Sequence, residues 1–320
     1  MDNYPHISVI IATYNRPNDL NRCLRSLCAV IYLDWDIIIL DQSTTCESQR
    51  VVESYIQQLP QLTYWPMQQW GLSWARNYGI RIASGDIIAF LDDDCTVTAD
   101  WLLQVQQVFQ RHPRATLVCG SVIAAAHDRS KHFIPVFDAG REISVRGRLG
   151  FLRTGGMGAS MYLRRSAIHT VGLFDVHLGP GSGYFDAADD LDYRYRCLAR
   201  GYSVVTTPAI SVIHYGMRDY RSGAAADLIN GYALAGSALV MKWLRCGDLG
   251  AFVLLAYHGR RYLALTSARQ QGERKVSPFL IRVMMYMHGL IASFQLDVDR
   301  IHQLYVASQK PAAKSTESRE

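Results

Sequence analysis

The chain has 320 residues, enough for about two domains of ordinary size or for one large α/β domain with an extension. Its composition, 49% hydrophobic and 19% charged, is that of a folded globular protein and excludes the disordered, collagenous and disulfide-scaffold classes. The formal net charge of +5 taken alone indicates an acidic partner, such as nucleic acid or an anionic membrane.

The first part of the chain predicts strands that alternate with helices. An apolar, β-branched run over 7–12 is followed by a loop and by Pro17, which suits the first turn of a helix extending to Leu27. The pattern continues with a strand over 36–40, a helix from about Glu47, a strand over 62–65, a helix from Gly71 to Ala83 and a strand over 86–91. Such alternation predicts a parallel sheet with helices on both faces, where ligands bind outside the carboxyl ends of the strands.

After residue 150 the sequence pattern changes from alternating strands and helices to glycine-rich loops between shorter elements. It contains glycine-rich loops over 155–158 and 179–183, a strand over 159–164, an acidic helix over 187–200 and two further strands over 203–207 and 210–214. From about residue 217 the chain predicts helices, because apolar residues between Leu228 and Trp243 recur at i, i+3 or i+4 spacing. The polar residues 308–320 predict a disordered tail.

Cysteine usage and the N-terminus indicate a cytoplasmic protein. The seven cysteines show neither a Cys-x-x-Cys pair nor a cluster at zinc spacing, so we interpret them as reduced structural thiols. The polar N-terminus leads directly into an apolar run, so no signal peptide is expected. The apolar stretch from Val276 to Leu296 is interrupted by Arg282 and His288, so we expect a buried or interfacial helix rather than a transmembrane span.

Three adjacent carboxylates, Asp92, Asp93 and Asp94, follow the apolar strand over 86–91. They repel one another, so their place at the end of a buried strand is unfavourable unless a cation neutralises them. A hard divalent ion such as Mg²⁺ or Mn²⁺ takes oxygen ligands and shares them readily with a diphosphate. The alternative is an exposed acidic turn that caps the next helix, but capping requires at most one such residue. The pattern therefore favours a metal site.

A second acidic group, Asp189 and Asp190, lies near the start of the predicted helix over 187–200. An ionised carboxylate within hydrogen-bond reach of a hydroxyl can act as a general base. Acids early and arginines late in a helix are also ordinary helix design, so the pattern alone leaves both interpretations open. His214 ends the last predicted strand, where an imidazole by itself is more typical of a core residue than of a metal ligand.

Three common motifs are absent from the chain. There is no Gly-x-Gly-x-x-Gly after the first strand, no phosphate-binding Gly-x-x-x-x-Gly-Lys-Ser/Thr loop and no Gly-x-Ser-x-Gly elbow. Their absence argues against a dinucleotide enzyme, a P-loop nucleotidase and a serine hydrolase.

Several segments between residues 6 and 216 form a recognisable series. They are SVIIATYNRP at 8–17, LDQS at 40–43, GLSWARNYG at 71–79, SGDIIAFLDDD at 84–94, GMGASMYLRR at 156–165, GLFD at 172–175 and DDLDYRYR at 189–196. In this order they resemble the family-2 glycosyltransferases, inverting enzymes that transfer a sugar from a nucleotide diphosphate. The resemblance implies an α/β fold of GT-A (Rossmann-like) type, with a mostly parallel sheet flanked by helices and a C-terminal α-helical extension.

The resemblance also implies a donor site. The residues expected to hold the nucleotide-sugar are Thr13, Tyr14, Arg16, Asp41, Gly71, Arg76, Asp92 and Asp93. A carboxylate such as Asp41 can accept the imide N–H of a pyrimidine, and Arg76 supplies a positive donor fork. Asp92 and Asp94 match the Asp-x-Asp motif, with Asp94 binding Mn²⁺ or Mg²⁺ directly and Asp92 reaching the ribose or a metal-bound water. His214 matches the distal metal ligand of the family.

The catalytic residues implied by the resemblance are Asp190 and Asp189. The family has a Glu-Asp pair here, and we expect Asp190 to be the base and Asp189 to support the acceptor. Ser160 also stands where an asparagine is frequent. The implied reaction is transfer from a UDP-sugar or related donor to a hydroxyl of a saccharide or lipid-linked acceptor, in polysaccharide or glycoconjugate biosynthesis. The alternatives are a sugar nucleotidyltransferase, whose basic glycine-rich loop is missing, and a noncatalytic membrane-associated scaffold.

The charge divides the chain into two regions. Residues 1–216 carry 19 basic and 20 acidic side chains, whereas residues 217–320 carry 14 and 8. We expect a catalytic domain over 1–216 (nucleotide half about 1–120, acceptor half about 150–216), a helical extension over 217–307 and the tail over 308–320. The extension either lies on the inner face of the cytoplasmic membrane or packs on the catalytic domain or a second subunit. A nucleic-acid partner is no longer needed to explain the charge.

Overall fold

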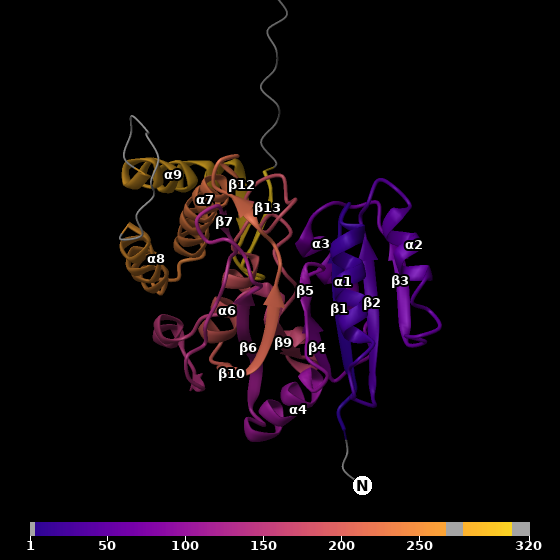
Figure 1. Cartoon of the computed structure of the whole chain (residues 1–320). Coiled ribbons are helices and arrows are strands. Elements are labelled where there is room, and N and C mark those ends of the chain that lie inside the picture. The colour runs from indigo at the N-terminus through magenta and orange to yellow at the C-terminus, as the bar shows by residue number, and fades with distance from the viewer. Residues whose placement is uncertain (1–3, 267–277, 309–320) are drawn as a thin grey trace, which may run out of the picture.

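The computed structural model describes residues 4–266 and 278–308 of the chain. Its centre is a nine-stranded sheet with the strand order β3-β2-β1-β4-β9-β6-β10-β5, and β8 pairs with β10 outside this path. Figure 1 shows the N-terminal strands at one end of the sheet and the C-terminal helices beyond the other end. The predicted α/β class is confirmed.

The N-terminal half of the sheet is parallel, as the alternating pattern predicts. β1 (Ile7–Thr13) lies between β2 (Trp35–Asp41) and β4 (Ile87–Phe90), and β3 (Leu62–Pro66) forms the edge beside β2. The register pairs Thr13 with Asp41, so the carboxyl ends of β1 and β2 lie at the same edge. Polar residues after these strands are therefore brought together there.

Helices cover both faces of this half because its strands are apolar on both sides. α1 (Pro17–Leu27), α2 (Glu47–Glu53) and α4 (Trp101–Arg111) pack against the face that carries Val9 and Ile37. α3 (Leu72–Ile82) packs against the opposite face, which carries Ile10 and Leu40. Alternate residues of one strand thus enter two separate cores.

The second half of the sheet is mixed. β9 (Met161–Arg164) is antiparallel to both β4 and β6 (Ala115–Ala124), and β6 runs parallel to β10 (Ser203–His214). The short strands are β5 (Cys95–Thr96) and β8 (Ile143–Val145), both antiparallel to β10, and β7 (His132–Phe133), which pairs with β11 (Arg218–Asp219). The sequence pattern did not predict α4, β6 or the short strands.

One strand prediction in this half was wrong. The two strands expected over 203–207 and 210–214 are the single strand β10, whose register with β6 shifts between Thr206 and Ser211. Pro208 lies within that shift. Because proline has no backbone N–H, it interrupts the ladder of hydrogen bonds without ending the strand.

Short helical segments connect the second half. α6 (Asp189–Ala199) is the predicted acidic helix, and α5 (Ile168–Val171) precedes it. Short 3₁₀ helices occupy η1 (Arg148–Arg153), η2 (Gly158–Ser160) and η3 (Arg165–Ala167). η2 places the predicted glycine-rich loop directly before β9.

The C-terminal extension is helical, as predicted, and it also carries a β-hairpin. Its helices are α7 (Ala224–Arg245), α8 (Ala251–Thr266) and α9 (Pro278–Ala292), followed by η4 (Ser293–Gln295). β12 (Leu296–Asp299) and β13 (Leu304–Ala307) then form the hairpin, which the sequence analysis included in the helical region. The tail predicted to be disordered lies outside the described residues, except for Ser308.

The extension shares a core with the second half of the sheet. Leu239 and Trp243 of α7, Leu254 of α8 and Tyr305 of β13 are buried in the same cluster as residues of β6 and α6. Over the described ranges, α7 alone is long and apolar enough to cross a membrane, and half of its most apolar window is buried inside the protein.

Candidate active site

A cavity of about 700 Å³ opens where the carboxyl ends of β1 and β4 meet the start of α6 and the inner side of α7 and α8. Of the predicted site residues, those that line the cavity are Thr13, Tyr14, Arg16, Gly71, Arg76, Asp92, Asp93, Asp94, Asp189, Asp190 and His214. Residues up to 200 positions apart in the sequence are brought together here by the parallel and mixed halves of the sheet.

Asp41 is the predicted residue that does not line the cavity. Its carboxylate is buried and accepts hydrogen bonds from the backbone N–H of Ser43 (2.8 Å) and the hydroxyl of Tyr64 (2.7 Å). The neighbouring Gln42 lines the cavity instead, and its side-chain amide donates to the carbonyls of Gln69 and Gly71. Gln42 is thus a site residue that the sequence analysis missed, although its place directly after β2 was a signal.

An aromatic pair also lines the cavity. Tyr14 and Trp70 are tilted against each other with ring centroids 4.5 Å apart, and both rings are exposed. The sequence analysis missed Trp70, whose position directly before Gly71 was the available signal. Gly71 itself has φ +109°, a conformation that favours glycine, and α3 begins immediately after it.

The triple-aspartate segment is held by cations and a hydroxyl. Thr13 Oγ1 donates to Asp93 Oδ2 (2.8 Å), and Arg16 Nη1 lies 3.3 Å from Asp93 Oδ1 and 3.1 Å from Asp94 Oδ2. Burial raises the pKa of Asp93 to about 7, although Arg16 and Thr13 act in the opposite direction. Asp93 and Asp94 thus share the Arg16 cation, which an exposed capping turn would not need.

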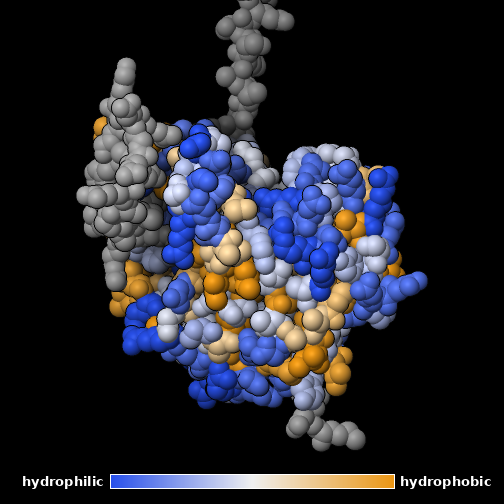
Figure 2. All heavy atoms as spheres, in the orientation of Figure 1, coloured by the Kyte–Doolittle hydropathy of each residue, from blue (hydrophilic) through white to orange (hydrophobic). Residues whose placement is uncertain are grey.

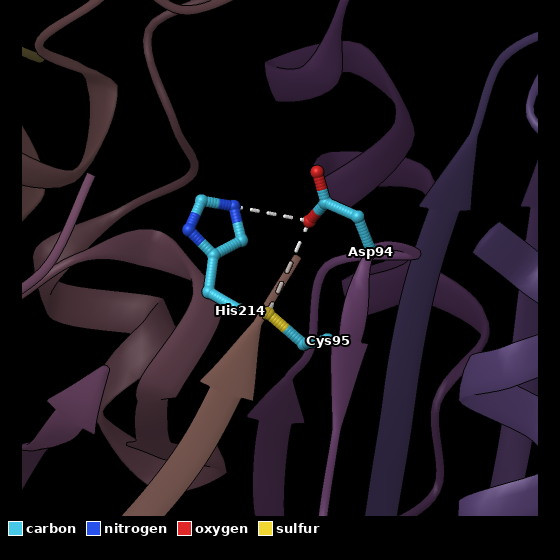
Figure 3. A group of neighbouring side chains, drawn as sticks. All are labelled: Asp94, Cys95 and His214. Carbon is cyan, nitrogen blue, oxygen red and sulfur yellow. Dashed lines mark hydrogen bonds and ion pairs between the residues drawn. The ribbon is translucent and has the colours of Figure 1, made fainter. Parts of the chain in front are cut away.

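Asp94 and His214 face each other across the end of β10 (Figure 3). His214 Nδ1 donates to the carbonyl of Pro135 (2.9 Å), and Nε2 lies 3.2 Å from Asp94 Oδ1, to which it donates when the ring is protonated. Burial disfavours the protonated ring, but the hydrogen bonds and charge of these partners outweigh it and raise the pKa of His214. Burial disfavours ionisation of Asp94, but the hydrogen bond and charge of His214 outweigh it, so the pKa of Asp94 is lowered. A second hydrogen bond that fixes the histidine tautomer is typical of metal-binding imidazoles.

Cys95 belongs to the same group of three potential ligands, whose ligand atoms lie within 4.8 Å of one another. Its Sγ lies 4.0 Å from Asp94 Oδ1 (Figure 3). Burial and the surrounding carboxylates raise the pKa of the Cys95 thiol well above its ordinary value, so the sulfur stays protonated. The available donors are thus carboxylate oxygen and imidazole nitrogen, a set that fits Mn²⁺ or Mg²⁺ rather than a thiolate-bound metal.

Arg76 connects the two acidic groups. Its Nη2 lies 3.2 Å from Asp92 Oδ1 and its Nη1 lies 2.5 Å from Asp189 Oδ2, while its guanidinium is 5.6 Å from the ring centres of Phe90 and Phe174. The side chain is therefore engaged by protein carboxylates. Burial raises the pKa of Asp189 to about 6, with Arg76 acting against this shift.

Asp190 is half-buried and oriented by backbone donors. The N–H of Gly158 donates to its Oδ2 (3.0 Å), and the N–H of Leu191 donates to its Oδ1 (2.7 Å). Gly158 can approach this closely to the site because it has no Cβ, which would lie 2.3 Å from Arg76 Nη2. Ala188, the residue directly before α6, has φ +72°. This strained backbone conformation is held in place because the residue is buried.

The C-terminal extension closes the other end of the cavity. Its contributing residues are Leu228, Ile229, Tyr232 and Gly236 of α7 and Tyr257 and His258 of α8. The sequence analysis assigned no part of the site to this region, because apolar residues at helical spacing indicate packing and not an opening.

The chain was compared with known proteins. The family model described as glycosyl transferase family 2 matches residues 8–172, half of the chain. The succinoglycan biosynthesis protein ExoM of Rhizobium meliloti is 31% identical over 183 residues, which cover 56% of this chain and 58% of that protein. A glucosyl-dolichyl phosphate glucuronosyltransferase of Haloferax volcanii is 25% identical over 131 residues, which cover 40% and 42%. The chain thus spans less than two thirds of these relatives.

Solved structures show the same architecture. Residues 1–349 of TarS from S. aureus superpose with a TM-score of 0.61 at 14% identity, over 91% of this chain and 80% of that one. The mannosyltransferase PcManGT of Pyrobaculum calidifontis, solved with GDP-Man and Mn²⁺, gives a TM-score of 0.58 at 16% identity, over 92% and 87%. Both are GT-A glycosyltransferases. The chain therefore belongs to glycosyl transferase family 2 and has the GT-A fold.

Proposed function

We propose that the protein is a metal-dependent, inverting glycosyltransferase. It transfers a sugar from a nucleotide-diphosphate donor, with a UDP-sugar favoured, to a hydroxyl of a saccharide or lipid-linked acceptor in polysaccharide or glycoconjugate biosynthesis. The observation that carries the proposal is that the Asp94–His214 pair and Asp190 line one cavity, so a bound diphosphate and an acceptor base can act on the same sugar.

The donor binds at the β1–β4 side of the cavity. Tyr14 and Trp70 offer aromatic surface for a base, and Arg16 offers positive charge for a phosphate. Asp41 already accepts two hydrogen bonds, but each carboxylate oxygen has a second lone pair through which it can accept one from a base. TarS has been solved with UDP-GlcNAc and PcManGT with GDP-Man, which supports a nucleotide-sugar here without choosing the nucleotide.

Asp94 and His214 would hold a divalent cation, Mn²⁺ or Mg²⁺, and Asp92, which lines the same cavity, would bind the ribose or support the cation. A bound cation would neutralise the charge that develops on the leaving diphosphate. His214 suits this task because its hydrogen bond to Pro135 directs Nε2 toward Asp94, and a bound cation would take the place of the proton on that nitrogen.

Asp190 is the general base. It takes the proton from the acceptor hydroxyl while that oxygen bonds to the anomeric carbon, and the bond from that carbon to the diphosphate breaks on the opposite face. The backbone N–H groups of Gly158 and Leu191 donate to its two oxygens and fix the direction of the carboxylate. Asp189 forms a buried ion pair with Arg76 and is therefore not free to act as the base. Its role is to support the part of the site that binds the acceptor.

The decisive experiment replaces Asp190 by asparagine, which keeps the shape of the side chain and removes its basicity. We expect transfer to fall by about 10²–10⁴-fold, since that is the usual contribution of a general base. Donor binding measured calorimetrically with Mn²⁺ should stay near the unmodified value. Near-normal transfer, or loss of donor binding in a folded D190N protein, would show that the assignment is wrong.

The two alternatives predict other results. A sugar nucleotidyltransferase would release diphosphate from a nucleoside triphosphate and a sugar phosphate, and the family match disfavours it. A noncatalytic scaffold would not hydrolyse any nucleotide-sugar in the presence of Mn²⁺. The relatives named for succinoglycan and dolichyl phosphate chemistry support an envelope polymer or a lipid-linked acceptor.

A further inference from the structure

The outward face of α9 is apolar along its whole described length. Its exposed side chains lie at i, i+3, i+4, i+7 and i+11 positions and continue into η4, and their exposed fractions range from 40% to 70%. We name this set the α9 stripe, and it consists of Leu280, Val283, Met284, Met287, Ile291 and Phe294. His288 is the polar residue exposed among them.

The polarity of α9 is inverted relative to an ordinary surface helix. Arg282 and Ser293 are buried, while the stripe faces outward. Gly289 fixes this orientation, since a Cβ there would lie 2.1 Å from the carbonyl oxygen of Leu234 in α7. Only the glycine side of α9 can approach α7 so closely, so the helix cannot rotate to bury the stripe. A stripe of this kind normally marks a contact with another surface.

α8 repeats the arrangement. Phe252, Leu255, Ala256 and Gly259 are exposed at i, i+3, i+4 and i+7, and Leu254 faces the core. α8 and α9 both pack against α7 and lie at the outer edge of the molecule (Figure 1). Their exposed apolar residues are more numerous than those of the smaller patch over β6 and β10, visible in the middle of Figure 2, which consists of Ile123, Val136 and Ile213.

The charge of this region indicates which kind of surface the α9 stripe contacts. Residues 251–295 carry six basic side chains and one acidic one; with Arg282 buried, five basic side chains remain, and the α9 stripe contains neither Asp nor Glu. A symmetric dimer through the stripe would bring two such basic regions together, because the same surface of both copies meets at the axis. Anionic lipid headgroups complement the basic charge, and acyl chains accept the apolar side chains. We propose that the α9 stripe docks the protein on an anionic membrane surface.

Docking would place the acceptor end of the cavity near the lipid. Tyr257 on the inner side of α8 lines the cavity, and Phe252 and Leu255 lie on its outer side. The helix α8, which lies beside the α9 stripe on α7, therefore has one side on the cavity and the other side exposed. The inference does not rest on glycosyl transfer, since it concerns only the outer face of the extension.

The test is co-sedimentation of the full chain with phosphatidylcholine vesicles, with and without about a third of phosphatidylglycerol. The variant M284Q/M287Q removes two exposed apolar side chains without changing charge. The matched control is I31Q/L33Q, which makes the same kind of change at two exposed residues of the loop before β2. Circular dichroism checks that all three proteins are folded, and analytical ultracentrifugation without lipid reports their oligomeric state.

The unmodified protein and I31Q/L33Q should bind the anionic vesicles equally, with binding that weakens as salt rises. M284Q/M287Q should bind at least about tenfold more weakly, because burial of each apolar side chain contributes to insertion. Absence of vesicle binding by the unmodified protein, or equal binding by M284Q/M287Q, would overturn the proposal. A dimer that M284Q/M287Q dissociates, without vesicle binding, would overturn it in favour of a second copy.

Discussion

At the scale of single residues, the site depends on protonation states that the surrounding chain imposes. His214 Nδ1 is held by Pro135, so Nε2 is the nitrogen that faces Asp94, at 3.2 Å. Cys95 Sγ lies farther from Asp94, at 4.0 Å, and burial and neighbouring carboxylates raise the pKa of its thiol. The two candidate ligands therefore differ in distance from Asp94 and in chemistry.

This difference can be tested by metal titration. We expect His214→Ala to weaken Mn²⁺ binding by about tenfold or more, given that changes around metal sites typically cost 10–100-fold. Cys95→Ser is the matched change and should leave the affinity within about twofold, because a protonated thiol is a poor ligand. Isothermal titration calorimetry with Mn²⁺ measures both. A larger loss in C95S than in H214A would indicate a thiolate site instead.

At the scale of elements, a buried ion network attaches α7 to α6 and to the loop after α5. Lys242 Nζ lies 2.9 Å from Asp175 Oδ2 and 2.5 Å from Asp192 Oδ1, and all three side chains are fully buried. The N–H of Tyr305 in β13 also donates to Asp175 Oδ2 (2.7 Å). Burial disfavours ionisation of Asp175, but the charge of Lys242 outweighs it and lowers the pKa of that carboxyl.

Replacing Lys242 by methionine keeps its volume and leaves Asp175 buried without the lysine cation, while Asp192 keeps its ion pair with Arg196 (2.9 Å). We expect the free energy of unfolding to fall by about 3–5 kcal/mol, the usual effect of breaking a buried ion pair on one side. Adding Asp175→Asn to this variant should recover part of the lost stability. The control is Lys131→Met, which makes the same change at an exposed lysine and should alter the free energy of unfolding by less than about 0.5 kcal/mol. Urea unfolding followed by circular dichroism gives these values. A K242M protein as stable as the original would contradict the network's role.

At the scale of the whole molecule, the catalytic half and the extension are one packed unit. The charge count placed a boundary near residue 216, yet α7, α8 and β13 contribute buried side chains to the core of the second half of the sheet. The cavity is likewise walled by both parts. The mixed half of the sheet therefore depends on the extension to keep its apolar side chains away from water.

A chain ended at residue 216 tests this dependence. Burial of Leu239, Trp243, Leu254 and Tyr305 would be lost at about 1.5–3 kcal/mol each, which approaches the about 5–15 kcal/mol that stabilise a whole domain. We expect the fragment to be aggregated or to lack a cooperative melting transition in scanning calorimetry. A chain ended at Ser308 keeps every described element and should melt as the full chain does. A cooperative, monomeric 1–216 fragment would establish an independent domain.

Much of the donor side followed from the sequence because its signals are local. Alternating apolar runs and helices predict the parallel strands β1 to β4, and strand ends in a parallel sheet meet at one edge, which located Thr13, Arg16 and Asp94. The late motif at Asp189 and Asp190 was likewise readable, since α6 begins there. Trp70 and Gln42 were missed although each stands next to a predicted site residue, because adjacency alone does not tell which side chain of a loop faces the cavity.

The sequence by itself determined the family, the class of fold and most of the polar residues of the site, because these depend on short patterns with fixed spacing. Only the tertiary structure decided that Asp41 lies outside the cavity lining, that Arg76 joins Asp92 to Asp189, and that α7 and α8 wall one end of the cavity. These facts depend on contacts between segments far apart in the chain. Helical periodicity says that one face of a helix is apolar, but packing decides whether that face meets a core, a cavity or solvent.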